Sequence, residues 1–481
     1  MSTKYIADLH CHTSLKPFRN PPKNLWETLD KPKKCGGLII NLAKLNELIT
    51  ESRTNLDKCV EGKVRLLFIT LMPVERSTFD LKCLGDLLIN EKKVGRCISG
   101  FSETYIEEIL ESIKDNSKID YFSELIKEYQ YLKGQEIVGS NGHIFKLAAN
   151  YEEAIKLINE SDKTIVGILT IEGAHAFNIY EHYEDILGTK FKEVDNEFTA
   201  VYKHYEAKFE AGITGVKTIM GDNTPFFANL THHFWNLLCG HAQSYNGLIA
   251  SIGIKQERFA NRGITKLGKK VINLLLSREN GRRILIDTKH MSLVSRKEFY
   301  HIWETEFEAK GDAFPIICSH AAVNGKDNFE EDAADFIKKQ DKKKKKRKRD
   351  KDKHRKGYYF NRWSINLYDE DIRMIAKSKG IIGIILHEDR LPGDFANDRI
   401  QVWLKRWRQI SDGMTLKLED GTILNKDQIK GELEDAILQV ILANIFHIVK
   451  VCNDQTGWDL IGLGTDFDGI INSFECYDDF I

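Results

Sequence analysis

The chain has 481 residues with a formal net charge of -1, and 42% of its residues are apolar, enough for a sizeable core. Nine scattered cysteines without a CxxC pair exclude a disulfide framework, and the longest apolar run, residues 66–72, is too short to span a bilayer. The start of the chain leads directly into the first strand, without a signal peptide. We therefore expect a soluble, cytoplasmic protein without a membrane partner.

Positive charge is concentrated in one segment. Residues 338–356 contain 14 Lys or Arg and three Asp, so the remainder of the chain is acidic. Like charges at this density repel one another and bury no apolar surface, which predicts a disordered insertion within a single domain, residues 1–481. Such a run can also bind a polyanion, which gives a non-enzymatic alternative. Because it has no aromatic residues for base stacking, nucleic acid is not the expected partner, and we expect it to attract anionic substrates.

Short apolar strands alternate with helices along the chain. We predict strands at residues 6–12, 65–71, 164–171, 215–220, 283–289, 315–319, 380–386 and 460–465. Predicted helices cover 38–48, 103–132 (a pair), 151–159, 196–210, 266–276, 295–309, 369–379 and 432–451, and Gly212 predicts a C-cap after residue 210. This alternation predicts an α/β (β/α)8 TIM barrel with helical and loop insertions.

The chain ends soon after Asp468, which leaves too little length for the helix that closes such a barrel. Either the sequence is truncated or the seam is covered by a partner, and a homo-oligomer is one such partner.

Two histidines share one face of the first strand. Successive side chains on a strand alternate in direction, so His10 and His12 point the same way. Two imidazoles on one strand are suited to bind a single metal ion, although two histidines satisfied by hydrogen bonds would give the same pattern.

Further metal-ligating residues stand in or just after the ends of other predicted strands. With the pair on the first strand they form a set of six: His10, His12, Glu172, His290, His320 and Asp466. In a (β/α)8 barrel the C-terminal strand ends converge on one mouth, where the active site is built. Isolated charges would be costly there, and a metal cation is the simplest partner for them.

Several motifs in these segments resemble those of the membrane (renal) dipeptidase family of zinc metallopeptidases, within the amidohydrolase superfamily. The similar segments, in order, are DLHCH (8–12), IEGAHAF (171–177), NLTHHFWN (229–236), ILIDTKHMS (284–292), IICSHAA (316–322) and GLGTDFDG (462–469). The resemblance implies two divalent metal ions, with zinc expected and manganese left open.

The resemblance also implies a role for each candidate residue. His10, His12 and Asp466 would bind one zinc, His290 and His320 the other, and Glu172 would bridge the two. His232 would contact the scissile carbonyl, with His233 as the alternative, and Arg362 would hold the substrate carboxylate. The family usually has an aspartate where this chain has His12, so the site should be more positive. The segment 221–225 also departs from the family pattern.

Taken together, these residues predict a metal-dependent hydrolase that cleaves a small amide or dipeptide bond with a metal-bridging hydroxide. Asp466 would move the proton from water to the leaving amine, and His232 would stabilise the oxyanion. Alternative reactions are those of a deacylase or deaminase of the same superfamily, or of a phosphoesterase, since DLHCHT also occurs in phosphoesterases of the polymerase and histidinol phosphatase type.

Overall fold

The computed structural model describes residues 5–29, 52–80, 91–187, 199–245, 256, 258–329, 359–410, 413–453 and 456–469. The expected helix at 38–48, the basic segment 338–356 and the chain after residue 469 lie outside these residues. The expectations about them therefore stay predictions.

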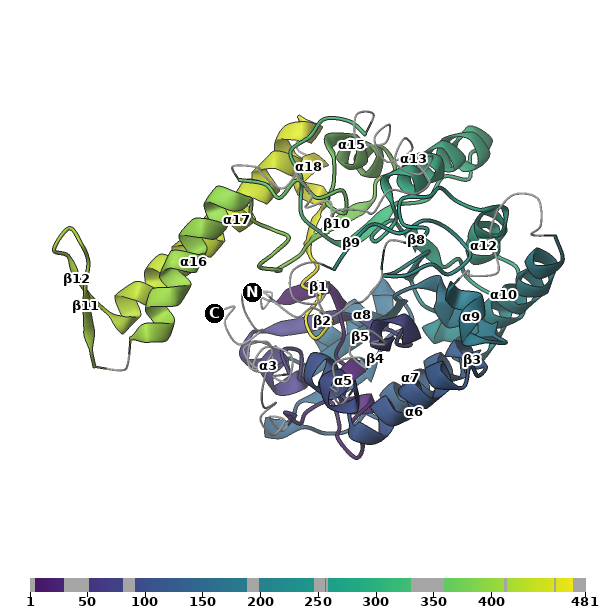
Figure 1. Cartoon of the computed structure of the whole chain (residues 1–481), viewed down its shortest axis with the longest axis horizontal. Coiled ribbons are helices and arrows are strands. Elements are labelled where there is room, and N and C mark those ends of the chain that lie inside the picture. The colour runs from purple at the N-terminus through teal and green to yellow at the C-terminus, as the bar shows by residue number, and fades with distance from the viewer. Residues whose placement is uncertain are drawn as a thin grey trace.

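Eight parallel strands close into a ring (Figure 1). In ring order they are β1 (Ile6–Cys11), β2 (Val64–Leu71), β5 (Thr164–Ile171), β7 (Phe227–Asn229), β8 (Leu285–Asp287), β9 (Ile317–Ala321), β10 (Ile381–Ile384) and β13 (Ile461–Leu463). The last strand closes the ring by pairing with the first, with Asp8 opposite Leu463. A short strand, β4 (Ile144–Leu147), lies beside the first half of β5. The structure thus confirms the predicted (β/α)8 barrel.

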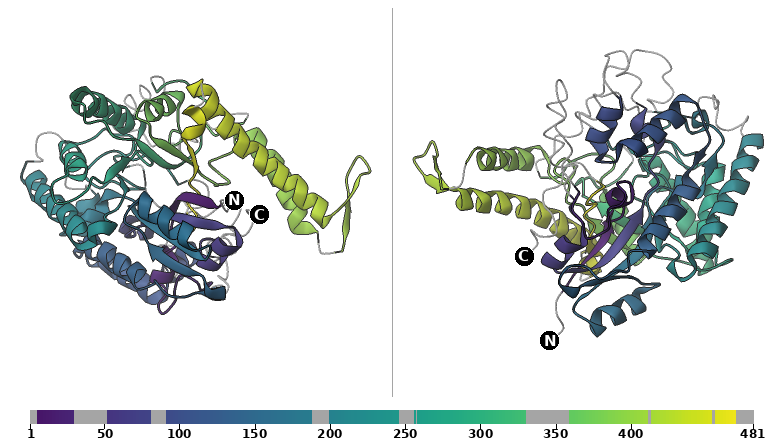
Figure 2. Two further views of the ribbon diagram at one scale, coloured as in Figure 1. Left: turned by 180° about the vertical axis from the view of Figure 1, so that it is seen from behind. Right: turned by 90° about the horizontal axis from the view of Figure 1, so that it is seen from below.

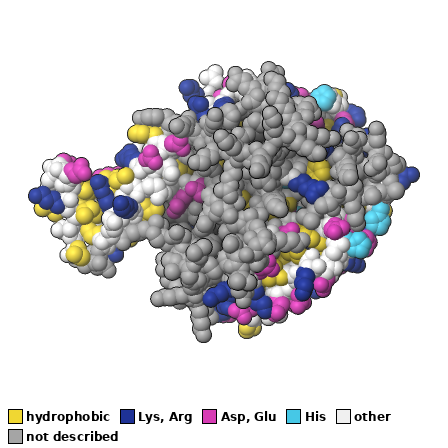
Figure 3. Space-filling model, in the orientation of Figure 1, with side chains coloured by type: hydrophobic (Ala, Val, Ile, Leu, Met, Phe, Trp, Pro, Cys, Tyr) yellow, Lys and Arg dark blue, Asp and Glu magenta, His cyan; other side chains and the backbone are white. Residues whose placement is uncertain are grey.

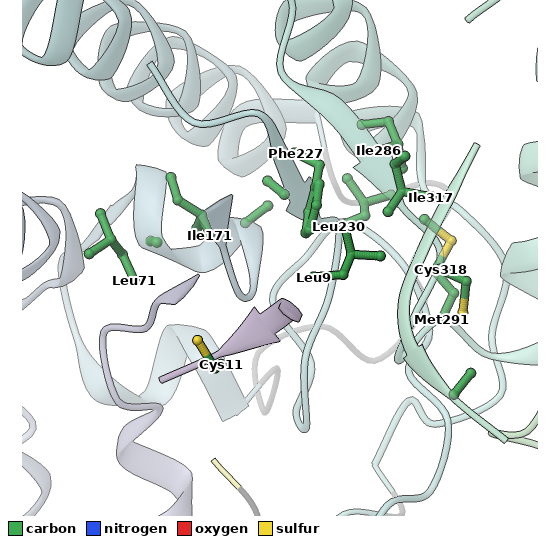
Figure 4. Packing of buried hydrophobic residues seen from close by; sticks show 14 of the residues in the cluster. Leu9, Cys11, Leu71, Ile171, Phe227, Leu230, Ile286, Met291, Ile317 and Cys318 are labelled. Atoms are coloured by element: carbon green, nitrogen blue, oxygen red, sulfur yellow. The ribbon is translucent and has the colours of Figure 1, made fainter. Parts of the chain in front are cut away.

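Helices surround the ring and complete a continuous core. The longer ones are α5 (Glu91–Ser99), α6 (Glu103–Lys114), α7 (Tyr121–Lys133), α8 (Tyr151–Glu160), α10 (Thr199–Met220), α12 (Lys266–Leu276), α13 (Leu293–Ile302), α15 (Asp369–Lys377), α16 (Asp394–Gln409) and α17 (Lys426–Cys452). Shorter elements are α1 (Leu15–Phe18), α3 (Leu56–Glu61), α9 (Tyr183–Leu187), α18 (Thr456–Asp459), and the strands β3 (Ile119–Asp120), β6 (Ile179–Tyr180), β11 (Thr415–Lys417) and β12 (Ile423–Asn425). Buried apolar side chains from the barrel strands and from the turns after them pack together in one cluster (Figure 4).

The predicted end of the helix at residues 196–210 and the strand after it are wrong. Residues 215–220 are not a strand, because α10 continues through Gly212 and Gly215 to Met220. A Cβ at position 212 would lie 1.7 Å from the carbonyl oxygen of Phe177, so the glycine allows close backbone contact and is not a C-cap. The fourth barrel strand is the short β7, after this helix. The predicted helix 295–309 also differs, because at Trp303 it passes into a π-helical turn.

A long arm, residues 394–452, leaves the barrel between β10 and β13. It consists of α16, the antiparallel hairpin β11–β12 at its tip, and the returning helix α17 (Figures 1 and 2). By length and composition α17 could cross a membrane, although 28% of its most apolar window is buried in the structure. The sequence analysis predicted a helix at residues 432–451, and α17 extends it at both ends.

A buried cluster of charges fixes the chain just after β2. Glu124 on α7 accepts hydrogen bonds from Arg19 Nη2 at 2.9 Å and Arg76 Nη2 at 3.1 Å. The Arg19 guanidinium also donates to the carbonyl oxygen of Met72 at 2.7 Å. Burial alone would raise the pKa of Glu124, but Arg76 and Arg19 lower it to about 2. The end of β2 is therefore held in place by ionised partners.

We expect Gly212→Ala to destabilise the protein by about 1–3 kcal/mol, because the methyl group would overlap the Phe177 carbonyl. Gly431→Ala in α17 is the matched control, since its Cβ would meet no atom within 4 Å, and it should stabilise by up to about 1 kcal/mol. Urea unfolding of both variants measures the difference. Equal stabilities would contradict the close contact between α10 and residue 177.

We expect Glu124→Gln to lower the free energy of unfolding by about 3 kcal/mol at pH 7, as its pKa of about 2 implies. Because the folded pKa is depressed, this stabilisation is present above about pH 4.5 and is lost as the pH falls towards 2. Urea unfolding at several pH values, with a metal chelator present, measures the difference in the free energy of unfolding between the variant and the wild type. An equally large difference in the free energy of unfolding at pH 2 would contradict the ionised cluster. The control is Glu111→Gln, because Glu111 is exposed.

Candidate metal centre

The six metal-ligating side chains expected from the sequence meet at the C-terminal end of the barrel, the barrel mouth. They come from five strands or the turns that follow them: His10 and His12 from β1, Glu172 after β5, His290 after β8, His320 from β9 and Asp466 after β13. All six are buried. The structure therefore brings together residues that lie up to hundreds of positions apart in the chain, as the strand-end pattern predicted.

Glu172 lies at the centre of this arrangement. Its Oε2 is 3.0 Å from His12 Nε2 and 3.6 Å from His10 Nε2. Its Oε1 is 3.0 Å from His290 Nε2 and 3.5 Å from the Nε2 atom of His320. One carboxylate thus faces two histidine pairs, with a separate oxygen for each.

Asp466 contacts both halves of the centre. Its Oδ1 lies 3.3 Å from His12 Nε2 and 3.7 Å from His10 Nε2, while Oδ2 lies 3.7 Å from the Nε2 atom of His320. Two groups of possible ligands share Glu172: His10, His12, Glu172 and Asp466 in one, and Glu172, His290 and His320 in the other. Two further groups overlap them: His10, Asp287 and His320, and His232, His233 and His290.

The chemistry of these donors fits divalent metal ions. Nitrogen and oxygen ligands about 2.0–2.2 Å from one ion lie roughly 3.3–3.6 Å apart, close to the separations above. The Nε2 atoms of His10 and His12 and the Oε1 atom of Glu172 are buried without a hydrogen-bond partner among the described residues. Two metal ions, one in each group, would satisfy all three atoms, whereas histidines that merely complete a core would already be hydrogen-bonded.

The pKa values of the side chains in the centre depend on one another. In the absence of metal, burial lowers the pKa of His12, but Asp466 and Glu172 raise it to about 10 overall. Burial would raise the pKa of Glu172, yet His232 and His10 hold it well below its usual value. His12, which stands where the similar family has an aspartate, therefore contributes positive charge until it is deprotonated by a metal.

Neighbouring groups orient the ligands. His10 Nδ1 contacts Thr70 Oγ1 at 3.2 Å, and His320 Nδ1 contacts Ser319 Oγ at 2.8 Å. His290 and Asp466 both have left-handed backbone conformations, with φ of 67° and 59°. Such conformations cost about 1–3 kcal/mol each and persist where the surrounding fold imposes them. The surrounding fold therefore holds these two side chains in their orientations at a cost in stability.

His232, not His233, faces the centre. His232 Nε2 is 3.6 Å from Glu172 Oε2, and its Nδ1 is held by Glu75 Oε2 at 3.0 Å. His233 stacks on His232 and directs its Nδ1 to Ser244 Oγ at 2.7 Å. Burial lowers the pKa of His232, but Glu172 and Glu75 raise it above its usual value overall. The sequence analysis missed Glu75, which lies just after β2 and also accepts hydrogen bonds from two backbone amides.

Arg362 is exposed, and the structure places a different arginine beside the centre. Arg390, which follows β10, is buried, and its nearest charges include Asp466 and Glu172. Its Nη2 donates to the carbonyl oxygen of Ser244 at 2.9 Å, but its Nε has no partner among the described residues. The position of Arg390 at a strand end is the same signal that identified the other site residues, so the sequence could have revealed it.

Lys289 is a second cation that the sequence analysis missed. It is buried next to His290, and its Nζ has no hydrogen-bond partner among the described residues. Burial and the charge of Arg390 lower the pKa of Lys289 to about 7. Arg390 and Lys289 are therefore two buried groups with unsatisfied donors among the described residues, and each has Asp466 among its charged neighbours.

A closed parallel barrel thus brings six side chains of metal-ligating type together at its mouth, an arrangement suited to hold divalent metal ions. Residues 355–480 match the model of the membrane dipeptidase family, peptidase family M19. The matched residues are about a quarter of the chain and include one of the six similar segments, GLGTDFDG (462–469). No curated protein is similar enough to the chain to count as a relative.

Among solved structures, the chain is similar to a metallo peptidase from Rhodobacter sphaeroides liganded with a phosphinate mimic of the dipeptide L-Ala-D-Ala. The identity is 12%, the match covers 100% of this chain and 91% of that chain, and the TM-score is 0.46. It is also similar to the probable dipeptidase PvdM from Pseudomonas aeruginosa, with 13% identity, 86% and 77% coverage, and a TM-score of 0.40. Similarity at this level does not assign a reaction, which must be argued from the site.

We expect the purified protein to bind about two equivalents of divalent metal per chain, because the donors form two groups that share Glu172. Glu172→Gln should lower this number, since it removes the negative charge that both groups share. Elemental analysis after dialysis measures the content. His301→Gln, on an exposed position of α13, is the matched control. Unchanged metal content in Glu172→Gln would show that Glu172 does not hold the metals.

Proposed function

We propose that the protein is a dipeptidase-like hydrolase that cleaves a small amide bond with the help of two divalent ions, zinc being expected. The observation that carries this proposal is the position of Glu172, which presents one oxygen to each of two histidine pairs. Bound ions would lower the pKa of a water molecule and polarise the scissile carbonyl.

Asp466 is suited to move the proton. Its two oxygens lie on both sides of the centre, 3.3 Å from His12 Nε2 and 3.7 Å from His320 Nε2. A carboxylate in this place can accept a proton from the attacking water and deliver it to the leaving amine. Its left-handed backbone conformation aims the side chain into the mouth.

His232 is suited to stabilise the oxyanion. Glu75 fixes its Nδ1, so the free Nε2 is directed towards the centre. In the metal-free protein both carboxylates raise the pKa of His232, and a protonated imidazole would present Nε2 as a donor. A donor already oriented towards the developing charge stabilises the transition state more than one that must first turn.

The two unsatisfied cations support a substrate that carries a carboxylate. Arg390 Nε and Lys289 Nζ are buried donors without partners among the described residues, which is costly unless an anion binds there. The free C-terminal carboxylate of a dipeptide is such an anion. We therefore propose that Arg390, and not the exposed Arg362, holds the substrate carboxylate.

We expect Arg390→Met to raise the KM for a dipeptide about 10- to 100-fold, because a charge-assisted hydrogen bond is lost. The same variant should act on the C-terminally amidated dipeptide about as well as the wild type does, because the amide offers no carboxylate. Arg362→Met is the matched control and should leave both substrates unaffected. Steady-state kinetics on the metal-loaded enzyme measure the two KM values.

If Arg362→Met raises the KM for the dipeptide and Arg390→Met does not, then Arg362 holds the substrate carboxylate, as the sequence motifs implied. N-acetyl amino acids carry the same carboxylate next to an amide, so they are included in the substrate panel. Faster cleavage of these compounds than of dipeptides would make the protein a deacylase and overturn the dipeptidase proposal.

A further inference from the structure

Three basic side chains stand at the barrel mouth beside the metal-ligating residues. Lys289 follows β8, and His387 and Arg390 follow β10. In the ring, β8 and β10 lie on either side of β9, which carries His320. All three basic side chains are buried, and none belongs to the groups of possible metal ligands that the described residues form. We call Lys289, His387 and Arg390 the basic cluster.

The members of the basic cluster lie close enough to act on one another. Burial holds the pKa of His387 well below its usual value, and the positive charges of Arg390 and Lys289 lower it further. His387 Nδ1 accepts a hydrogen bond from the backbone amide of Asp389 at 3.0 Å, so the neutral ring carries its proton on Nε2. The basic cluster therefore presents three donor side chains to a ligand.

The turn after β10 fixes Arg390 in this place. The backbone amide of Arg390 donates to the carbonyl oxygen of His387 at 3.2 Å, and the carbonyl oxygen of Arg390 accepts from Asn366 Nδ2 at 2.9 Å. The guanidinium donates through Nη2 to the carbonyl oxygen of Ser244 at 2.9 Å. One end of the guanidinium is thus anchored, while its Nε stays without a partner among the described residues.

The carboxylates near the basic cluster have another role. Lys289 has Asp466 and Asp287 among its charged neighbours, and each belongs to a group of possible metal ligands. Neither accepts a hydrogen bond from Lys289 Nζ, which has no partner among the described residues. Once metal ions occupy the centre, the carboxylates that hold them no longer compensate the cations beside them.

Basic residues on the outer surface are placed differently. On the face shown in Figure 3, Lys and Arg side chains are interspersed with Asp and Glu. Lys377, for example, contacts carboxylate oxygens of Glu304 at 2.9 Å and of Glu308 at 2.7 Å. Water also solvates such exposed cations. Lys289 is buried and its Nζ has no partner among the described residues, so an anion from a ligand would supply the acceptor that it lacks.

A single substrate carboxylate leaves part of the basic cluster unpaired. A carboxylate that pairs with Arg390, as in the proposed function, satisfies the Nε donor of that guanidinium. Lys289 Nζ then still lacks an acceptor, and a buried ammonium without a counter-ion is costly. Two cations in one buried place match a ligand that carries two negative charges.

We propose that Lys289 and His387 bind a second carboxylate of the substrate, and that the protein therefore prefers dipeptides that end in aspartate or glutamate. The two carboxylates of such a residue are only a few bonds apart, so Arg390 can hold the main-chain carboxylate while Lys289 holds the side-chain one. The inference rests on the proposed function, because it takes the amide next to a C-terminal carboxylate as the bond that is cleaved.

An inorganic dianion such as phosphate is the competing occupant, since it also carries two negative charges. The surroundings of the basic cluster favour a substrate. Asp466 is among the charged neighbours of both Lys289 and Arg390, and it is the residue suited to move the proton in the proposed function. A ligand held by the basic cluster therefore lies beside the reacting groups.

Kinetics on matched substrates test the proposal. We expect the metal-loaded wild type to cleave Ala-Glu with a kcat/KM at least about 10-fold higher than that for Ala-Gln, because only the glutamate side chain offers a charge to Lys289. Lys289→Met should abolish this preference, and Lys289→Arg should keep most of it. Lys297→Met, on an exposed position of α13, is the matched control and should keep the full preference.

The wild-type comparison decides even if Lys289→Met fails to fold. Each substrate is supplied with the C-terminal residue in its L and in its D form. If the wild type cleaves Ala-Gln as well as Ala-Glu in both forms, the dipeptidase proposal stands and the second carboxylate site is refuted. An unchanged preference in a folded Lys289→Met variant refutes it as well.

Binding of the product separates this proposal from the proposed function. Free glutamate and glutamine contain no bond to be cleaved, so calorimetric titration of the metal-loaded protein measures the basic cluster without turnover. We expect glutamate to bind at least about 10-fold more tightly than glutamine, and Lys289→Met to remove the difference. If this preference is found but no dipeptide is cleaved, the proposed function fails and the carboxylate site is supported.

The same titration includes inorganic phosphate. Equal binding of glutamate and glutamine, together with phosphate binding that is lost in Lys289→Met, would assign the basic cluster to phosphate and refute the proposal.

Discussion

The barrel mouth depends on one buried carboxylate. Glu172 faces two histidine pairs that come from β1, β8 and β9, and its ionised state is favoured by His232 and His10. Without Glu172, the two histidine pairs would lie close together with no carboxylate that presents one oxygen to each pair. Burial makes the interaction strong, because no water screens it. Divalent metals would complete the balance of charge, since three of the buried ligand atoms lack a hydrogen-bond partner among the described residues.

The surrounding fold keeps this arrangement rigid. Glu75 orients His232 from the turn after β2, and the cluster around Glu124 fixes the chain just before Glu75. Asp468 holds the same region from the other side, because it accepts hydrogen bonds from Lys16 and Thr54. Each strand end is thus tied to its neighbours by buried polar contacts, which is how a loop-built site attains fixed geometry.

The errors in the sequence interpretation have a common physical origin. Gly212 was expected to end a helix, but it lets α10 pass close to the Phe177 backbone, a contact between segments that no local pattern reports. Arg362 followed from alignment across the basic segment, whereas Arg390 follows the next barrel strand, β10, and is the arginine that lies buried near Asp466. In both cases the sequence shows the type of residue, but it does not show which distant residue lies beside it.

The sequence alone predicted the barrel, although not its fourth strand, and it placed six candidate metal-ligating residues at strand ends, because strand periodicity and strand ends are local features. It did not determine which histidine of the pair 232–233 faces the centre, because the orientation of His232 depends on its contact with Glu75, which follows β2. Nor did it reveal that Lys289 and Arg390 are buried without partners, or that one face of α17 is exposed. Burial and partner choice arise from contacts between distant segments, so only the tertiary structure decided them.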